Sequence, residues 1–159
     1  MSPEIISPTQ NVNDAPPWGT YSPQGINKLL LFVIRLGLGR GKNKKLIQYL
    51  WNSSSNNSVV DINYHNILLR CSLQTNNIER KILFSSKLRE KKEINLLKPY
   101  LKNGGTFVDI GANVGYYSLM AAQMGAKKVL SFEPNRAALS RFEFNVNVNG
   151  FNHIIDALP

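Results

Sequence analysis

Two acidic residues and the glycine-rich segment between them have the types and spacing of a ligand-binding site. Asp109 lies in the apolar run 106–110, just before the Gly-Ala-Asn-Val-Gly segment at 111–115, and Glu133 follows the next apolar run. A strand that turns sharply into a helix against a ligand needs backbone positions without a Cβ atom, which the two glycines supply. Glu133 lies 22 residues after the first of them, where a carboxylate can accept hydrogen bonds from both hydroxyls of a ribose. This layout is typical of a site for a nucleoside cofactor.

The glycine pattern distinguishes two classes of nucleoside cofactor. Dinucleotide sites use Gly-x-Gly-x-x-Gly, which brings the backbone against a pyrophosphate. Segment 111–115 has no middle glycine, and the carboxylate of Asp109 would repel a pyrophosphate. The same carboxylate suits a ligand that has an ammonium group and a sulfonium group. We therefore expect S-adenosylmethionine (SAM) as the cofactor rather than a dinucleotide.

Three segments, 106–119, 131–135 and 145–149, resemble the opening motifs of the FkbM family of methyltransferases. The resemblance covers about residues 90–159 and implies a SAM-binding class I (Rossmann-like) α/β fold. It also implies, as the usual activity, O-methylation of a hydroxyl on a glycan or secondary metabolite. In such folds Asp109 and segment 111–115, which we call the glycine loop, would flank the methionine part of SAM, and Glu133 would hold the ribose. The predicted cofactor-binding residues are Asp109, Gly111, Ala112, Asn113, Gly115, Glu133, Pro134 and Asn135.

The elements that must position these residues alternate between strand and helix. Apolar runs predict strands at 106–110, 128–132 and about 153–157, and helices are expected at about 115–124 and 136–149. This alternation predicts a parallel sheet with right-handed crossovers. The resemblance implies the strand order 3-2-1, with the first strand central in the complete sheet.

Two asparagines in the last expected helix allow more than one interpretation. Asn145 and Asn149 match a recurrent feature of the resembled family, but helix capping and turn formation explain them equally well. The apolar face of the same helix is expected at Ala138, Leu139 and Phe142.

The N-terminal hundred residues predict a separate region. Residues 1–25 contain five prolines among polar residues and are expected to form a flexible leader. Residues 26–51 have a helical pattern with a basic break, two short β-rich runs at 59–63 and 67–73 suggest a hairpin, and 79–102 read as helical. The expected division of the chain is a leader at 1–25, a helical and hairpin region at 26–105, and the first half of a SAM-binding domain at 106–159.

The charge of the chain is concentrated in that N-terminal region. The net charge is +9, and residues 1–100 contribute +8 of it. Such a surface could attract an anionic glycan, a membrane surface or nucleic acid. No aromatic-interleaved nucleic-acid motif accompanies the charge, so we expect a solvated basic face, no nucleic-acid partner, and peripheral membrane contact as an open alternative.

The longest apolar run, six residues at 29–34, is shorter than the roughly 20 residues of a membrane span. We therefore expect a cytoplasmic or membrane-peripheral protein with no integral span.

Other catalytic and metal-binding patterns are missing from the sequence. Cys71 is the only cysteine, which excludes an internal disulfide framework and a cysteine metal cluster. His65 and His153 are isolated, and we expect them to be surface or packing residues. We predict no metal site, and no general base can be named, so the catalytic residues are unknown.

The chain stops at Pro159, about where the third expected strand ends. The resembled enzymes continue through four more strands, which usually bring the acceptor-binding groups. We therefore expect a fragment that is inactive alone, from an enzyme acting on a small-molecule or glycan acceptor. Two other readings stay open: a nucleotide-dependent dehydrogenase-like Rossmann protein, and a non-catalytic basic adaptor that binds a membrane or a polyanion.

Overall fold

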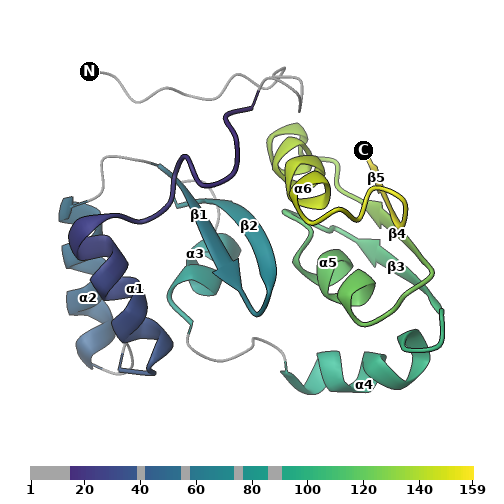
Figure 1. Cartoon of the computed structure of the whole chain (residues 1–159), viewed down its shortest axis with the longest axis horizontal. Helices are drawn as coiled ribbons and strands as arrows, with labels where there is room; N and C mark the ends of the chain where they lie inside the picture. Colours follow the sequence, from purple (N-terminus) through teal and green to yellow (C-terminus); the bar gives the residue numbers. More distant parts are fainter. Residues whose placement is uncertain (1–14, 39–41, 55–57, 74–76, 86–90) are drawn as a thin grey trace.

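The fold has an N-terminal part of helices and a β-hairpin and a C-terminal α/β part, as the computed structural model in Figure 1 shows. The structure describes residues 15–38, 42–54, 58–73, 77–85 and 91–159. In chain order the elements are α1 (Gly25–Arg35), α2 (Lys42–Ser54), β1 (Val59–Tyr64), β2 (Ile67–Ser72), α3 (Asn77–Leu83), α4 (Lys91–Leu101), β3 (Thr106–Ile110), α5 (Tyr116–Gln123), β4 (Lys128–Phe132), α6 (Arg136–Val148) and β5 (Ile155–Leu158).

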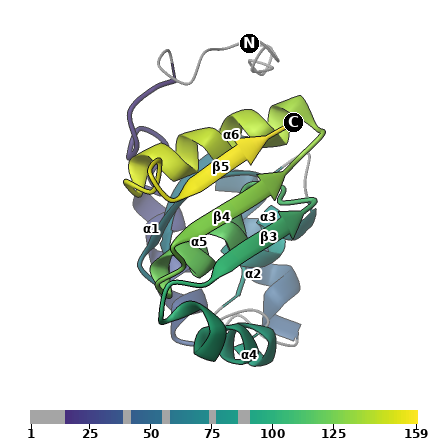
Figure 2. The ribbon, with the colours of Figure 1, turned by 90° about the vertical axis from the view of Figure 1, so that its right-hand side faces the viewer.

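The C-terminal part is built on a parallel sheet with the strand order β3-β4-β5. Helices α5 and α6 connect its strands and lie against one face, behind the sheet in Figure 2. The predicted α/β fold and strand order are therefore confirmed, and the expected third strand is shifted by about two residues, to 155–158.

Alternation along β3 separates a covered face from an open one. Phe107 and Asp109 are partly buried, whereas Val108 and Ile110 are 52% and 84% exposed. No described strand pairs with the outer edge of β3. Its expected central place in a larger sheet stays a prediction.

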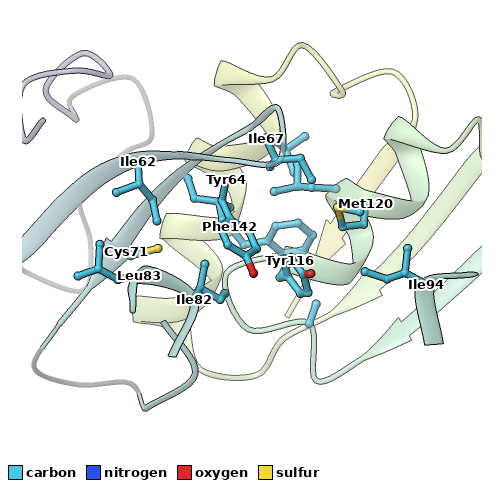
Figure 3. Close-up of a cluster of buried hydrophobic side chains, with 14 of the residues drawn as sticks. Ile62, Tyr64, Ile67, Cys71, Ile82, Leu83, Ile94, Tyr116, Met120 and Phe142 are labelled. Carbon is cyan, nitrogen blue, oxygen red and sulfur yellow. The ribbon is translucent and has the colours of Figure 1, made fainter. Parts of the chain in front are cut away.

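The hairpin β1–β2 forms as predicted, with a two-residue turn at His65 and Asn66. Both turn residues have positive φ, 52° and 66°, the geometry that matches the twist of paired strands. The hairpin packs onto the C-terminal part through a buried aromatic cluster. Figure 3 shows Tyr64 of β1, Tyr116 of α5 and Phe142 of α6 within this cluster. The rings of Tyr64 and Tyr116 have centroids 6.0 Å apart. This apolar contact makes the two parts of the chain one core.

A buried ion pair attaches the segment before α1 to the hairpin. Asp61 and Arg70 face each other across the strands, with Arg70 Nε 2.8 Å from Asp61 Oδ1. The guanidinium also donates to the carbonyls of Pro16 and Pro17, and Asp61 Oδ2 accepts from the backbone N–H of Gly19. The described part of the expected leader, 15–24, is thus a segment packed on the hairpin. Residues 1–14 lie outside the described residues.

The helical pattern at 26–51 forms two helices rather than one. Helix α1 ends at Arg35, α2 begins at Lys42, and the basic break between them lies partly outside the described residues. Ile34 and Trp51 are buried, so one side of each helix packs against protein. Within the described ranges, no helix is both long and apolar enough to cross a bilayer.

The side-chain amides of Asn145, in α6, and of Asn149, just after α6, hydrogen-bond to the backbone at the free edge of β2. The amide of Asn145 accepts from the N–H of Arg70 at 2.7 Å and donates to the Arg70 carbonyl at 3.4 Å. Asn149 does the same with Leu68, at 2.9 Å and 2.7 Å. Asn145 also donates to the carbonyl of Val114 at 3.0 Å. The pair therefore ties the hairpin to α6 and to the glycine loop. Asn149 is also the C-cap of α6, where its side-chain amide donates to the carbonyl of Asn145 at 2.7 Å, so the expected capping role is confirmed for Asn149.

Asn145→Ala is expected to lower the free energy of unfolding. Asn145 is fully buried, and the change leaves backbone groups of Arg70 and Val114 without partners, at about 1–3 kcal/mol for a buried group that loses its hydrogen bond. Urea unfolding measures the effect. Asn147→Ala is the matched control, since Asn147 is exposed on the same helix and should cost no more than about 0.5 kcal/mol. Equal losses for the two variants would contradict the role assigned to Asn145.

Candidate functional site

The glycine loop folds over the end of β4 through backbone hydrogen bonds. The N–H groups of Gly111 and Ala112 both donate to the carbonyl of Phe132, at 2.8 Å and 3.0 Å. Three residues of the loop, Gly111, Asn113 and Gly115, have positive φ, of 81°, 55° and 83°. Glycine adopts this backbone region without steric cost, and asparagine tolerates it better than most residues. The loop is thus a tight turn from β3 into α5.

The two glycines serve different purposes. A Cβ atom on Gly111 would have no described atom within 4 Å, so open space lies above this residue. A Cβ atom on Gly115 would lie 2.0 Å from Cδ2 of Phe142, whose ring is fully buried. Gly115 is therefore required by the packing of α6 against the loop. Gly111 is the position at which a ligand could approach the backbone.

Glu133 lies at the end of β4 and joins the two loops of the site. Its Oε2 accepts from the N–H of Asn113 at 2.8 Å, and its Oε1 accepts from the N–H of Asn135 at 2.7 Å. The residue is 8% exposed. Each carboxylate oxygen has a second lone pair, so the group can still accept from a ligand while it holds both loops. Sequence reasoning predicted the ligand role and missed the structural one.

Asp109 is connected to two buried serines. Ser118 of α5 donates to Asp109 Oδ2 at 2.6 Å, and its Oγ lies 2.9 Å from the Oγ of Ser131 in β4. Both serines are fully buried. Sequence reasoning missed them, although a serine inside the apolar run of β4 and another on the covered side of α5 were a usable signal. The chain of hydroxyl groups orients the carboxylate at the end of β3.

Burial raises the pKa of the Asp109 carboxyl above its ordinary value of 3.8, the hydrogen bonds from Ser118 lower it, and the negative charge of Glu133 raises it. The net direction is upward. The folded chain therefore binds this proton more tightly than the unfolded chain does, and the ionised form is a cost to folding. Two carboxylates at the ends of adjacent strands make the site favourable for a cation.

Asp109→Asn is expected to raise the stability of the chain at neutral pH. Because the pKa of Asp109 is raised in the folded chain, protonation of its carboxyl stabilises the fold. This contribution is complete below pH 3.8, the ordinary pKa of the group, and is lost as the pH rises through the higher pKa of the folded chain. The variant avoids that loss, and its amide oxygen can still accept from Ser118. Thermal unfolding between pH 3.5 and 7 checks the prediction: the gap between variant and wild type should widen with pH. A variant less stable than wild type at pH 7 would contradict it.

The remaining predicted site residues differ in how they take part. Ala112 is buried in the core cluster, so it can contribute only its backbone. Pro134 is exposed. Asn135 is the N-cap of α6, where its Oδ1 accepts from the N–H of Ala138 at 3.0 Å, as capping residues do. The structure thus brings all the predicted residues to one end of the sheet, while their contact with a cofactor stays a prediction.

The single cysteine lies away from this loop. Cys71, on β2, is fully buried, and that burial raises the pKa of its thiol well above its ordinary value. A thiol held in its protonated form is a poor nucleophile. His65 and His153 are both exposed, as expected for surface residues.

Over about a third of its length the chain is similar to curated methyltransferases. It is 40% identical over 53 residues to a tRNA U34 carboxymethyltransferase of Campylobacter hominis, a match that covers 33% of this chain and 19% of that protein. It is 34% identical over 62 residues to a ribosomal protein L11 methyltransferase of Listeria monocytogenes, covering 39% of this chain and 20% of the relative. The chain therefore spans about a fifth of the length of these relatives. No protein-family model matches it.

Two solved structures match part of the chain, both with TM-scores below 0.5. A SAM-dependent methyltransferase of Agrobacterium tumefaciens has a TM-score of 0.49 and 14% identity, over 65% of this chain and 34% of that one. Protein arginine methyltransferase 10 of Arabidopsis thaliana has a TM-score of 0.44 and 24% identity, over 54% of this chain and 24% of that one.

Proposed function

We propose that this chain forms part of the SAM site of a SAM-dependent methyltransferase, the class of enzyme to which it is similar over about a third of its length. The observation on which this rests is the position of Glu133. Its carboxylate lies at the end of β4, hydrogen-bonded to the glycine loop, beside the open space above Gly111. A second carboxylate, Asp109, lies one residue before the end of the neighbouring strand, β3.

The residues present fit the chemical groups of SAM. Asp109 is a partly buried carboxylate that a cationic group would neutralise, as the ammonium of SAM would. Glu133 retains lone pairs for the two ribose hydroxyls, and Gly111 leaves its backbone open to contact. When bound, SAM supplies an electrophilic methyl group on a sulfonium. The part of these residues is to hold and orient the cofactor and to exclude water from it.

The acceptor is proposed from the resemblance to FkbM methyltransferases: a hydroxyl group of a glycan or a secondary metabolite, methylated on oxygen. The curated relatives are named for a tRNA and for a ribosomal protein, so similarity in this segment does not select the acceptor. Transfer of a labelled methyl group from SAM to hydroxylated glycans, measured with a longer methyltransferase that contains this segment, tests this finer proposal. Transfer only to RNA or to protein would overturn it and leave the SAM site intact.

A dinucleotide-dependent enzyme is the alternative that uses the same turn from strand to helix. The paired carboxylates and the absence of a middle glycine disfavour a pyrophosphate at this loop. A thermal-shift measurement with SAM and with NAD separates the two. Stabilisation by SAM alone supports the proposal, and stabilisation by NAD alone would overturn it.

Glu133→Ala is expected to weaken SAM binding by about 1.5–3 kcal/mol, the usual range for hydrogen bonds to a charged group. Isothermal titration calorimetry with SAM measures this loss. Because Glu133 also holds Asn113 and Asn135, thermal unfolding must be followed in parallel. Glu143→Ala, which removes a carboxylate from the middle of α6, is the control and should bind SAM like wild type. Unchanged affinity in Glu133→Ala would remove the ribose assignment.

A further inference from the structure

Helix α1 has an apolar side that nothing described in the structure covers. Ile26, Leu29, Phe32 and Leu36 are each between 49% and 60% exposed. Their spacing places them along one side of the helix. On the other side, Leu30 and Ile34 are buried against the rest of the protein. The exposed side is therefore not needed to hold α1 in place.

Helix α2 packs against α1 and has large exposed apolar residues of its own. Leu46 and Tyr49 are 58% and 68% exposed on α2, and Leu38, just after α1, is 57% exposed. Figure 1 shows the two helices together at the end of the molecule farthest from β3, β4 and β5. We call the following residues the α1/α2 surface: Ile26, Leu29, Phe32, Leu36, Leu38, Leu46 and Tyr49, with the exposed lysines Lys28, Lys44 and Lys45.

The charge of this segment has a single sign. Residues 25–54 contain six Lys or Arg residues and no Asp or Glu. Large exposed apolar side chains beside lysines are the two signals that together give stable binding to an anionic membrane surface. The lysines complement lipid phosphates, and the apolar side chains reach the boundary between headgroups and acyl chains.

The same features disfavour other occupants. A nucleic acid would use the lysines and leave seven large apolar side chains in water. A second copy of the chain on this surface would bring two unbalanced cationic segments together, which repel each other. The helices are too short to span a bilayer, at 11 and 13 residues. An interfacial position satisfies both the apolar and the charged residues.

We propose that the α1/α2 surface docks the chain on an anionic phospholipid bilayer. This goes beyond the proposed methyltransferase activity and does not depend on it. The α/β part, with the glycine loop, belongs to the other end of the molecule and would stay in water. The acceptor hydroxyl would then be found among molecules at or near a membrane surface.

Vesicle co-sedimentation of the 159-residue chain tests this proposal. The expected result is binding to vesicles with 30% phosphatidylserine in phosphatidylcholine, weak binding to phosphatidylcholine alone, and loss of binding as salt is raised. Leu29→Glu with Phe32→Glu should lower the partition coefficient at least about tenfold. Lys44→Gln with Lys45→Gln should lower it about fivefold per lysine, and only on anionic vesicles.

Matched controls come from α4, which has exposed residues of the same kinds. Leu96 and Tyr100 are 70% and 77% exposed, and Lys92 and Lys98 are exposed lysines. Leu96→Glu with Tyr100→Glu, and Lys92→Gln with Lys98→Gln, should leave binding unchanged. Circular dichroism confirms that each variant has the wild-type fold.

Four results would overturn the proposal. The first is the absence of vesicle binding by the wild-type chain. The second is an equal loss of binding in the α4 controls, which indicates non-specific adsorption. The third is light scattering that shows a dimer dissociated by Leu29→Glu with Phe32→Glu, which assigns the surface to a second copy. The fourth is binding to poly(U) or heparin that is the same in wild type and in Leu29→Glu with Phe32→Glu, together with no binding to vesicles.

Discussion

Gly111→Val is expected to abolish SAM binding while the chain remains folded. The residue has φ of +81° and no described atom within 4 Å of a Cβ position, so a valine there strains the backbone while its Cβ atom has room. Left-handed backbone costs a non-glycine residue roughly 1–2 kcal/mol. The branched side chain would fill the space proposed for the cofactor, and we expect affinity to fall at least about 100-fold, or roughly 2.8 kcal/mol. Calorimetry with SAM measures the affinity.

Gly150→Val is the matched control for this change. Gly150 has φ of +71° and likewise no described atom within 4 Å of a Cβ position, but it follows the end of α6. Both variants should lose similar stability in thermal unfolding, and only Gly111→Val should lose SAM. If Gly111→Val bound SAM normally, the loop would not be the cofactor site.

Gly115→Ala is expected to destabilise the fold itself. The new methyl group would lie 2.0 Å and 2.1 Å from two carbons of the Phe142 ring, and the backbone φ is +83°. Overpacking of a core costs typically 1–3 kcal/mol, and the left-handed backbone adds roughly 1–2 kcal/mol. The sum, about 2–5 kcal/mol, is a large part of the roughly 5–15 kcal/mol by which domains are stable. Urea unfolding measures the loss.

A double-mutant cycle separates the clash from the backbone strain. In a Phe142→Ala background every side-chain atom that the new methyl group would strike is gone, so Gly115→Ala should cost only the strain, as Gly150→Ala does in the wild-type chain. The expected coupling between positions 115 and 142 is about 1–3 kcal/mol. Equal costs of Gly115→Ala in both backgrounds would show that Phe142 is not the reason for the glycine.

The sequence by itself determined the order of elements in the C-terminal part. Apolar runs and glycine positions predicted β3, α5, β4 and α6 to within about two residues of their ends, because strand and helix periodicity are local properties. They also placed Asp109 and Glu133 at the ends of adjacent parallel strands. The hairpin followed from two β-rich runs around His65 and Asn66.

Local pattern could not determine contacts between residues far apart in the chain. Arg70 bonds with Pro16, 54 residues before it, and its backbone bonds with Asn145, 75 residues after it. A buried charge or amide needs partners wherever the fold supplies them, and sequence spacing does not reveal which residues those are. For this reason the segment before α1 was expected to be a leader, and Asn145 was open to interpretation as a cap.

Only the tertiary structure decided the second role of Glu133 and the different reasons for the two loop glycines. The Glu133 carboxylate joins two loops because the ends of β3 and β4 lie side by side, a result of sheet pairing. Gly115 is needed because α6 returns across the loop and buries Phe142 against it. The sequence shows which residues can do chemistry, and packing determines what else each of them must touch, because close packing is set by elements that are distant along the chain.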